Sequence, residues 1–374
     1  MASAAHDRSS TPAWPLALAW TLLIINASLF PFSDWRWPPG QPISALLVLP
    51  WPLWRDDFDL WSNLLGYMPL GLLLAAGLRH QGRGIAATLL MVLAGAAALS
   101  YGNELLQTFL PNRHPSLKDW AMNTAGAGAG AVLTLVFDTL GSGRRWRTAQ
   151  TRWFVRRSAA AQSLLALWPF ALMFPAPLPL GLGQIFEPLR STMLDWVSGV
   201  PWAASLAEWL AQAPAPSQPL GPLSEGLVTA LGLLAPCMLA FAITPPGWRR
   251  LVLAGGALTL ALAAMTLSTL LNFGPRHAFA WLMPATAPAL ACGALAAACL
   301  ALSSRRLAAG VGLVAVVAAT ALVAQAPADP YFAASLLAWE QGRFVRLHGL
   351  TQWIAGAWPY LAVMVLLGRL ARED

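Results

Sequence analysis

The sequence predicts an all-α protein that crosses a membrane about ten times, and three observations lead to this class. The composition is 57% hydrophobic and only 10% charged, whereas soluble domains carry about a quarter charged residues. The mean hydropathy is +0.57, and several apolar runs exceed the roughly 18 residues that a membrane-spanning helix needs. These runs are continuous rather than alternating in polarity, which argues against a transmembrane barrel.

The apolar runs place the expected spans along the chain. The first run follows a short polar head and lacks a convincing small-residue cleavage site, so we expect a retained span rather than a signal peptide. The expected ranges, in order, are 12–31, 59–78, 85–110, 118–140, 158–176, 224–244, 250–271, 279–302, 307–325 and 349–369.

Basic residues predict how these spans are oriented, because cytoplasmic loops are enriched in Lys and Arg. With the N-terminus in the cytoplasm, an even number of spans returns the C-terminus to the cytoplasm as well. Most of the 23 basic residues then fall on the inner side. The inner set comprises Arg8, Arg79, Arg83, Arg144, Arg145, Arg147, Arg152, Arg156, Arg157, Arg249, Arg250, Arg305, Arg306, Arg369 and Arg372.

The net charge of +7 does not indicate a nucleic-acid partner, because the basic residues lie singly or in short clusters between apolar runs. The three cysteines, Cys237, Cys292 and Cys299, lie inside apolar runs without metal-type spacing. We expect them to be buried core residues. No metal ion or cofactor is expected from these patterns.

Three segments on the expected outer side, 32–58, 177–223 and 326–348, are longer and carry Trp and Pro. Parts of them place aromatic residues and Leu at helical spacing beside a few charges. Tryptophan prefers the headgroup zone, so we expect short helices lying on the outer leaflet. A packed lid without a ligand role is an equal alternative.

Between residues 100 and 130 the chain is densely polar, although apolar runs flank this stretch. Spans 85–110 and 118–140 are joined by a short turn and are therefore antiparallel neighbours. These two spans and span 59–78 each carry polar residues at helical spacing near the outer end. The three stripes are Asp59, Asn63 and Tyr67; Ser100, Glu104 and Gln107; and Asp119 and Asn123.

Charged side chains inside a membrane usually face a partner or a polar cavity, so we expect the three stripes to converge. Arg113, in the turn, would neutralise Glu104 or Asp119. Pro69 removes one backbone hydrogen bond within the second span and is expected to open that helix beside the stripes.

The run AGAGAG at residues 125–130 is low in complexity. Gly126 and Gly130 lie four residues apart and form a small-xxx-small face, which is typical of close helix packing in membranes. No Lys follows the glycines, so a phosphate-binding loop is not expected here.

This stretch and the span before it resemble the VanZ-like membrane proteins, a family named after a teicoplanin-resistance accessory protein. The matching residues are Asp59, Asn63, Pro69, Gly71, Ser100, Glu104, Gln107, Pro111, Arg113, Ser116, Asp119, Asn123 and Gly126, in order and at family spacing. The resemblance covers roughly residues 10–140. It implies a multi-pass protein of the bacterial inner membrane, which in some members lowers susceptibility to a lipoglycopeptide.

The small VanZ-like proteins end near the point where the resemblance stops, so we expect three parts. Residues 1–143 form the VanZ-like transmembrane domain, residues 144–158 a basic cytoplasmic linker, and residues 159–374 a C-terminal transmembrane extension.

The polar residues favour a binding function. The expected ligand is a polar lipid headgroup, a lipid-linked cell-wall intermediate or a lipoglycopeptide, whose acyl chain stays in the membrane while its head enters the pocket. Arg113 suits an anion because its guanidinium group can donate two parallel hydrogen bonds. Gln107, Asn63 and Asn123 suit sugars and amides.

Three alternatives remain open. Glu104 and Asp119 could act as acid and base of a membrane hydrolase or transferase, or bind a metal ion with His114, although no GxSxG, HExxH or P-loop motif is present. Many spans and a Pro-containing second helix also permit a lipid transporter. The fourth possibility is purely structural, with the stripes acting as interhelical hydrogen bonds.

Overall fold

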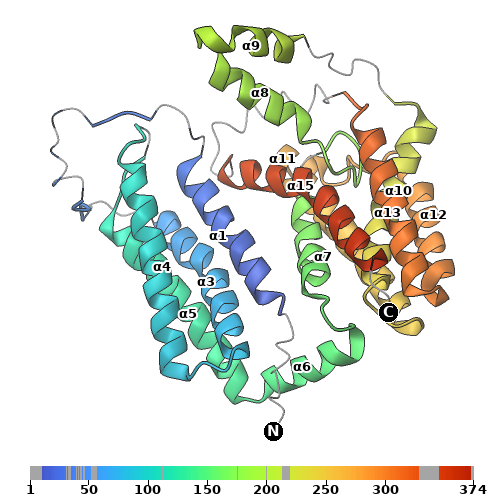
Figure 1. Cartoon of the computed structure of the whole chain (residues 1–374), viewed down its shortest axis with the longest axis horizontal. Coiled ribbons are helices and arrows are strands. Elements are labelled where there is room, and N and C mark those ends of the chain that lie inside the picture. Colours follow the sequence, from blue (N-terminus) through green and yellow to red (C-terminus); the bar gives the residue numbers. More distant parts are fainter. Residues whose placement is uncertain are drawn as a thin grey trace. The chain divides into compact units, whose positions relative to one another are not determined.

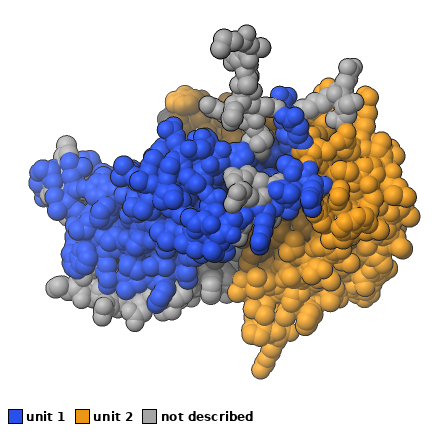
Figure 2. All heavy atoms as spheres, turned by 90° about the horizontal axis from the view of Figure 1, so that it is seen from below, with its two compact units in different colours: residues 1–152, 156–163 blue, residues 153–155, 164–374 orange. Residues whose placement is uncertain are grey.

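The computed structural model describes residues 11–30, 32, 35–38, 40, 42, 44, 47–51, 57–111, 113–174, 176–198, 200–212, 220–327 and 345–371. Every regular element within these residues is a helix, which confirms the all-α class. The chain divides into two compact units (Figure 2). Unit 1 comprises residues 1–152 and 156–163, and unit 2 comprises residues 153–155 and 164–374.

Helices that can cross a membrane run through both units. In the described part of the chain, 7 helices are long and apolar enough: Leu60–His80, Ile85–Gln107, Leu117–Thr139, Pro222–Phe241, Trp248–Phe273, Arg305–Val323 and Thr351–Leu370. Shorter apolar helices cover Ala13–Leu29, Ala159–Ala171 and Thr286–Leu302. One of these helices lies at each expected range, while the number of spans and their orientation stay predictions.

Unit 1 is a bundle in which α1 (Ala13–Leu29), α3 (Asp57–His80), α4 (Ile85–Gln107) and α5 (Leu117–Thr139) pack side by side (Figure 1). The helix α6 (Ser142–Trp153) follows and occupies much of the stretch expected to be a linker. The bundle core includes Ile24 of α1, Tyr67 and Leu70 of α3, Val92 of α4 and Ala127 of α5.

Close approach of α3 and α5 depends on glycine. A Cβ atom on Gly126 or Gly130 would collide with the α3 backbone at Leu64 and Met68, and Gly71 faces the α5 backbone in the same way. The expected small-xxx-small face is therefore confirmed, because only glycine lets the two backbones touch here.

The structure does not show the expected opening of α3 at Pro69, because the helix continues from Asp57 to His80 with Pro69 inside it. Trp20 of α1 donates a hydrogen bond from Nε1 to the carbonyl of Gly66 at 2.8 Å. Packing on both sides, by α1 and by the glycine face of α5, holds the proline-containing turn in a continuous helix.

Unit 2 contains the remaining helices. Its elements are α7 (Ala159–Ala171), whose first turn lies in unit 1, α8 (Phe186–Val197), α9 (Ala204–Ala211), α10 (Pro222–Phe241), α11 (Trp248–Phe273), α12 (Thr286–Cys299), α13 (Arg305–Val323) and α15 (Val345–Leu370). Cys237 of α10 is buried as expected, but Cys292 and Cys299 of α12 are exposed. Apolar runs thus do not mark burial in this protein, because the outer faces of its helices are apolar as well.

The residues 176–185, which we call the buried segment, are non-helical but lie inside unit 2. Leu180 packs against Gly232 in the middle of α10. Thr229 donates its hydroxyl hydrogen to the carbonyl of Pro179 at 3.2 Å, and the N–H of Gly183 donates to the carbonyl of Ala355 at 3.0 Å. Part of the segment expected at the outer surface is therefore enclosed by α10 and α15, where neighbouring helices satisfy its backbone groups.

The expected short helices of segment 177–223 are present as α8 and α9, at the end of unit 2 where α10 begins (Figure 1). Each helix exposes an apolar face: Trp196 of α8 is 75% exposed and Trp209 of α9 is 68% exposed. Their position on a membrane surface stays a prediction. Most of the expected segment 326–348 lies outside the described residues.

Candidate functional site

The polar stripe on α4 contacts two neighbouring helices of unit 1. The hydroxyl oxygen of Ser100 accepts a hydrogen bond from Asn123 Nδ2 of α5 at 2.9 Å. One turn and then two turns further along α4 come Glu104 and Gln107. Gln107 donates from Nε2 to the carbonyl of Ser28 in α1 at 3.0 Å. The stripe therefore connects α4 to both α5 and α1.

Glu104 is buried, with 4% of its surface exposed. Its Oε2 atom accepts a hydrogen bond from the backbone N–H of Ser116 at 2.8 Å. Ser116 is the N-cap of α5, and its side chain accepts from the N–H groups of Lys118 at 3.1 Å and Asp119 at 3.3 Å. An acidic group at this position is favourable because a helix N-terminus carries partial positive charge. Glu104 thereby fixes the turn between α4 and α5.

One acceptor atom in this region is buried without a hydrogen-bond partner. Asn123 is 5% exposed, and its Oδ1 atom has no partner, although its Nδ2 atom donates to Ser100.

Arg113 interacts with the end of α1. Its Nη2 atom donates to the carbonyl of Phe30 at 2.7 Å and lies 3.4 Å from the carbonyl of Ala27. The expected ion pair of Arg113 with Glu104 or Asp119 stays a prediction.

Sequence reasoning missed Asn103. This residue is 4% exposed and donates from Nδ2 to the hydroxyl oxygen of Tyr67, which is also 4% exposed, at 3.5 Å. An asparagine next to Glu104 in an otherwise apolar helix was the available signal. We define the polar cluster as Tyr67, Ser100, Asn103, Glu104, Ser116 and Asn123.

The remaining expected site residues lie at the edge of the polar cluster or beyond it. Gln107 and Asp119 are half-buried, and Asn63 of α3 is half-buried without a recorded hydrogen bond. The side chain of Asp59 lies outside the described residues, although its backbone belongs to α3.

Exposed tryptophans surround the same end of unit 1. Trp37 is 55% exposed and its ring lies 5.4 Å from that of Phe109, just after α4. Trp51 follows Pro50, whose carbonyl accepts from the N–H of Leu117 at 2.9 Å. Trp51 and Trp61 are 61% and 63% exposed. Such a belt is typical of the boundary between hydrocarbon and headgroups.

The opposite end of unit 1 carries an ion pair. Arg79 of α3 donates to Oδ2 of Asp138 in α5 at 2.7 Å, with side chains 28% and 20% exposed. This pair joins the same two helices as the glycine face and lies away from the polar cluster.

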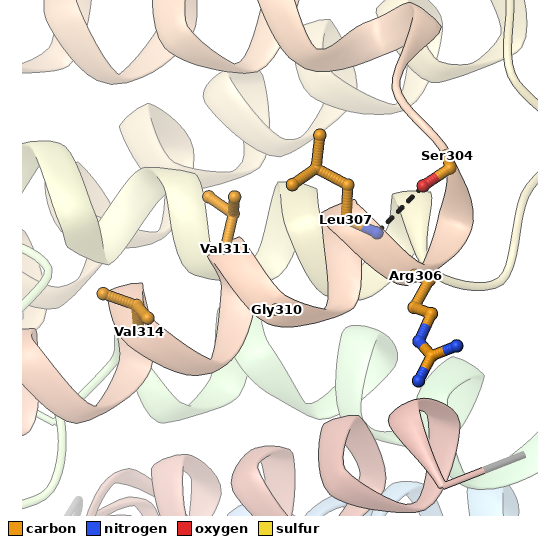
Figure 3. A pocket seen from close by; sticks show the side chains of 6 residues that line it. All are labelled: Ser304, Arg306, Leu307, Gly310, Val311 and Val314. Carbon is orange, nitrogen blue, oxygen red and sulfur yellow. Dashed lines mark hydrogen bonds between the residues drawn. The ribbon is translucent and has the colours of Figure 1, made fainter.

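The described residues contain no group of three or more His, Cys, Asp or Glu side chains placed to hold a metal ion, and Glu104, His114 and Asp119 do not form one. A hollow on the surface of unit 2 follows the first turns of α13 (Figure 3). Its lining includes Leu307 and Val311, and Arg306 points away from them.

Long apolar helices with exposed apolar faces define the class of this chain as a helical membrane protein. Within it, residues 9–138 match the family model described as VanZ/LLP1. This region contains the polar cluster and confirms the VanZ-like resemblance expected for the first part of the sequence. Neither the curated proteins nor the solved structures searched contain a match.

Proposed function

We propose that this VanZ-like membrane protein acts in the bacterial cell envelope by binding the polar head of a lipid-anchored molecule at the polar cluster. The candidate ligands are a polar lipid, a lipid-linked cell-wall precursor and a lipoglycopeptide. Binding would give it an accessory role similar to teicoplanin resistance. The acyl chains of the ligand would remain in the surrounding lipid.

The observation that carries this proposal is a buried polar cluster whose hydrogen bonding is incomplete. Asn123 is 5% exposed, and its Oδ1 atom is buried without a hydrogen-bond partner. A buried polar atom without a partner is unfavourable by about 1–3 kcal/mol, so natural proteins keep few of them. Their presence beside exposed tryptophans supports a ligand that arrives from the membrane surface.

The proposal includes a topology. We place ten spans in the inner membrane, both termini in the cytoplasm and the polar cluster on the outer side. Cysteines introduced singly at His114 and at Arg145, in a protein without native cysteines, test this arrangement. A membrane-impermeant maleimide added to intact spheroplasts should label the first position and not the second. The reverse pattern would invert the topology and remove the proposed binding face.

A strain that lacks the gene tests the function, when complemented with wild type or variants at matched protein levels. We expect Glu104→Ala to lose the survival conferred under glycopeptides or lipopeptides, because the polar cluster loses its carboxyl group and the turn between α4 and α5 loses the hydrogen bond from Ser116. Arg113→Ala should lower survival less. Asp138→Asn, which removes a carboxylate at the opposite end of unit 1, is the matched control and should behave as wild type.

Equal survival of the deletion strain and wild type on all such compounds would contradict the envelope-binding role. Equal survival of the Glu104→Ala and Asp138→Asn strains would show that the binding site is not the polar cluster. This holds even if the deletion strain shows that the protein is needed for survival.

The buried segment favours a second candidate function, lipid transport. Non-helical backbone at membrane depth is tolerated where it is enclosed by protein or lines a path for a polar group. Purified protein in liposomes with a fluorescent headgroup-labelled lipid would test this. If the protein transports lipid, dithionite should bleach more than the outer-leaflet half of the fluorescence, and Gly183→Leu should restore the half-bleached level.

A further inference from the structure

The hollow on α13 follows a helix face that begins with charge and continues as apolar surface. Its volume is about 600 Å³. Leu307 is 52% exposed and Val314 is 67% exposed. Between these two residues the helix rises about 10 Å, roughly a third of the hydrocarbon core of a membrane. The residues that line the hollow are Ser304, Arg306, Leu307, Gly310, Val311 and Val314 (Figure 3).

A glycine keeps this hollow open. A Cβ atom on Gly310 would meet no atom within 4 Å. Gly312, two residues further along α13, instead faces the interior of unit 2, because its Cβ atom would lie 2.8 Å from Cβ of Met238 in α10. One side of α13 is therefore tightly packed, whereas the side at Gly310 is open to a ligand.

Three arginines lie at the end of unit 2 where α13 begins. Arg305 and Arg306 are the first two residues of α13. Arg250 donates from Nη1 to the carbonyl of Ser303 at 2.7 Å. This bond holds the start of α11 beside the start of α13, so Arg249, in the first turn of α11, belongs to the same end.

The acidic residues that the structure describes in unit 2 belong to its other end. They lie on α8, on α9 and in the first turn of α10, and they are Glu187, Asp195, Glu208 and Glu225. The end where α10 finishes and α13 begins thus carries arginines and, among the described residues, no carboxylate. Such an end is complementary to an anion at the level of the lipid headgroups.

We propose that the hollow on α13 holds one acyl chain of an anionic phospholipid, whose phosphate group binds Arg306. The site lies in unit 2 and does not depend on the proposed function of the polar cluster. Arg306 is exposed, and its guanidinium group points away from Leu307 and Val311, which leaves the hollow apolar (Figure 3). Arginine side chains near helix ends extend toward the headgroups, where they can donate two parallel hydrogen bonds to a phosphate.

A lipid fits this surface better than a second copy of the chain. Two copies that meet symmetrically along α13, side by side in one membrane, would bring Arg305 and Arg306 next to the same residues of the partner. The like charges would repel each other. An anionic lipid brings the opposite charge together with an apolar chain.

Native mass spectrometry of the full-length protein tests the headgroup. Protein in detergent is mixed with equal amounts of phosphatidylglycerol and phosphatidylethanolamine that have identical acyl chains. We expect about fivefold greater retention of phosphatidylglycerol, the effect of one arginine near a membrane surface. Arg306→Ala should remove most of this preference. Arg276→Ala, after the other end of α11, is the matched control and should keep it.

Filling the hollow tests the acyl chain. Gly310→Leu places a side chain where the acyl chain would lie and should lower the retention of both lipids severalfold. Gly255→Leu on α11 is the matched control, because a Cβ atom there also meets no atom within 4 Å, and it should retain lipid as wild type does. Elution of both variants at the wild-type position in size-exclusion chromatography checks that they fold.

Three results would overturn the proposal. Equal retention of the two lipids by the wild-type protein would exclude an anionic ligand. Equal retention in Gly310→Leu and Gly255→Leu would show general lipid contact rather than a site in the hollow. A wild-type dimer that is lost in Gly310→Leu would assign the hollow to a second copy. If Gly310→Leu does not fold, an unchanged preference in Arg306→Ala overturns the proposal by itself.

Discussion

Glu104 in unit 1 and Arg250 in unit 2 are buried charged side chains at helix ends, but their hydrogen bonding differs. Arg250 is 0% exposed. Its Nε and Nη atoms donate to the carbonyls of Phe241, Thr244, Ala301 and Ser303, at distances from 2.7 to 3.4 Å. These carbonyls lie at the C-terminal ends of α10 and of the helical turn after α12, where a positive charge is favoured. Glu104 makes one bond, at an N-terminus.

The difference separates a charge with all of its donors bonded from a charge that makes a single bond. The recorded bonds of Arg250 number five, which matches the five N–H donors of a guanidinium group. No donor remains for a ligand, so Arg250 can only hold helix ends together. Glu104 instead joins α4 to the start of α5 through a single hydrogen bond. The buried charge of unit 2 thus makes five hydrogen bonds, whereas that of unit 1 makes one.

Removing Arg250 should produce the largest effect on stability. Arg250→Ala leaves several buried carbonyls without donors, each at a cost of about 1–3 kcal/mol, so we expect a loss of about 3–5 kcal/mol in the free energy of unfolding of unit 2. Arg250→Lys should recover only part of it, because lysine has three donors and no fork. The measurement is the reactivity of the buried thiol of Cys237 in a Cys292→Ser, Cys299→Ser background.

Arg249→Ala is the matched control for this prediction. Arg249 precedes Arg250 in the chain and its guanidinium carbon lies 5.9 Å from the Trp248 ring centroid, a surface cation–π contact. We expect a loss of no more than about 1 kcal/mol. Equal thiol reactivity in the two variants would remove the distinction between Arg250 and an ordinary topology-determining arginine.

Packing gives the next largest effect and concerns unit 1. Gly126→Ala should destabilise the α3–α5 contact by about 1–3 kcal/mol, because its Cβ would collide with backbone rather than with a flexible side chain. Gly95→Ala on α4 meets no atom within 4 Å and should be neutral or stabilising by up to about 1 kcal/mol. SDS titration in mixed micelles measures both changes. A Gly126 variant as stable as the Gly95 variant would contradict the close packing.

The sequence predicts much of this fold because composition and periodicity are local properties. Apolar length locates the helices, and spacing assigns Ser100, Glu104 and Gln107 to one face of α4. The partner of Glu104 could not be read in this way, because it is a backbone N–H and every residue except proline carries one. The pair Tyr67 and Asn103 depends on the rotation of α3 against α4, which spacing within a single helix does not determine.

Arg250 and the buried segment show the same limit in unit 2. Two adjacent arginines between apolar runs predict a cytoplasmic loop. The side chain of Arg249 is half-buried. The sequence alone does not distinguish Arg250 from Arg249. The difference arises only in the folded structure, where two helix ends place their carbonyl groups around Arg250. In the buried segment, too, the sequence indicates only a non-helical stretch around Leu180, Gly181 and Gly183. Its burial follows from the glycine at position 232 of α10, against which Leu180 packs.

The smallest expected difference in stability concerns two serines that cap helix N-termini, one in each unit. Ser116 is 5% exposed and accepts two backbone N–H bonds while its own N–H donates to Glu104. Ser304 of unit 2 is exposed and accepts one bond, from Leu307 at 3.1 Å. We expect Ser116→Ala to lower the free energy of unfolding by about 1–2 kcal/mol and Ser304→Ala by about 0.5 kcal/mol.

SDS titration of the two serine variants side by side measures this difference. Ser116 begins the helix whose first turn also holds Glu104, so loss of its hydroxyl group should loosen the contact between α4 and α5. Ser304 begins α13 at an exposed position and holds no second side chain through its backbone N–H. Equal losses of stability in the two variants would contradict a special role for the buried N-cap.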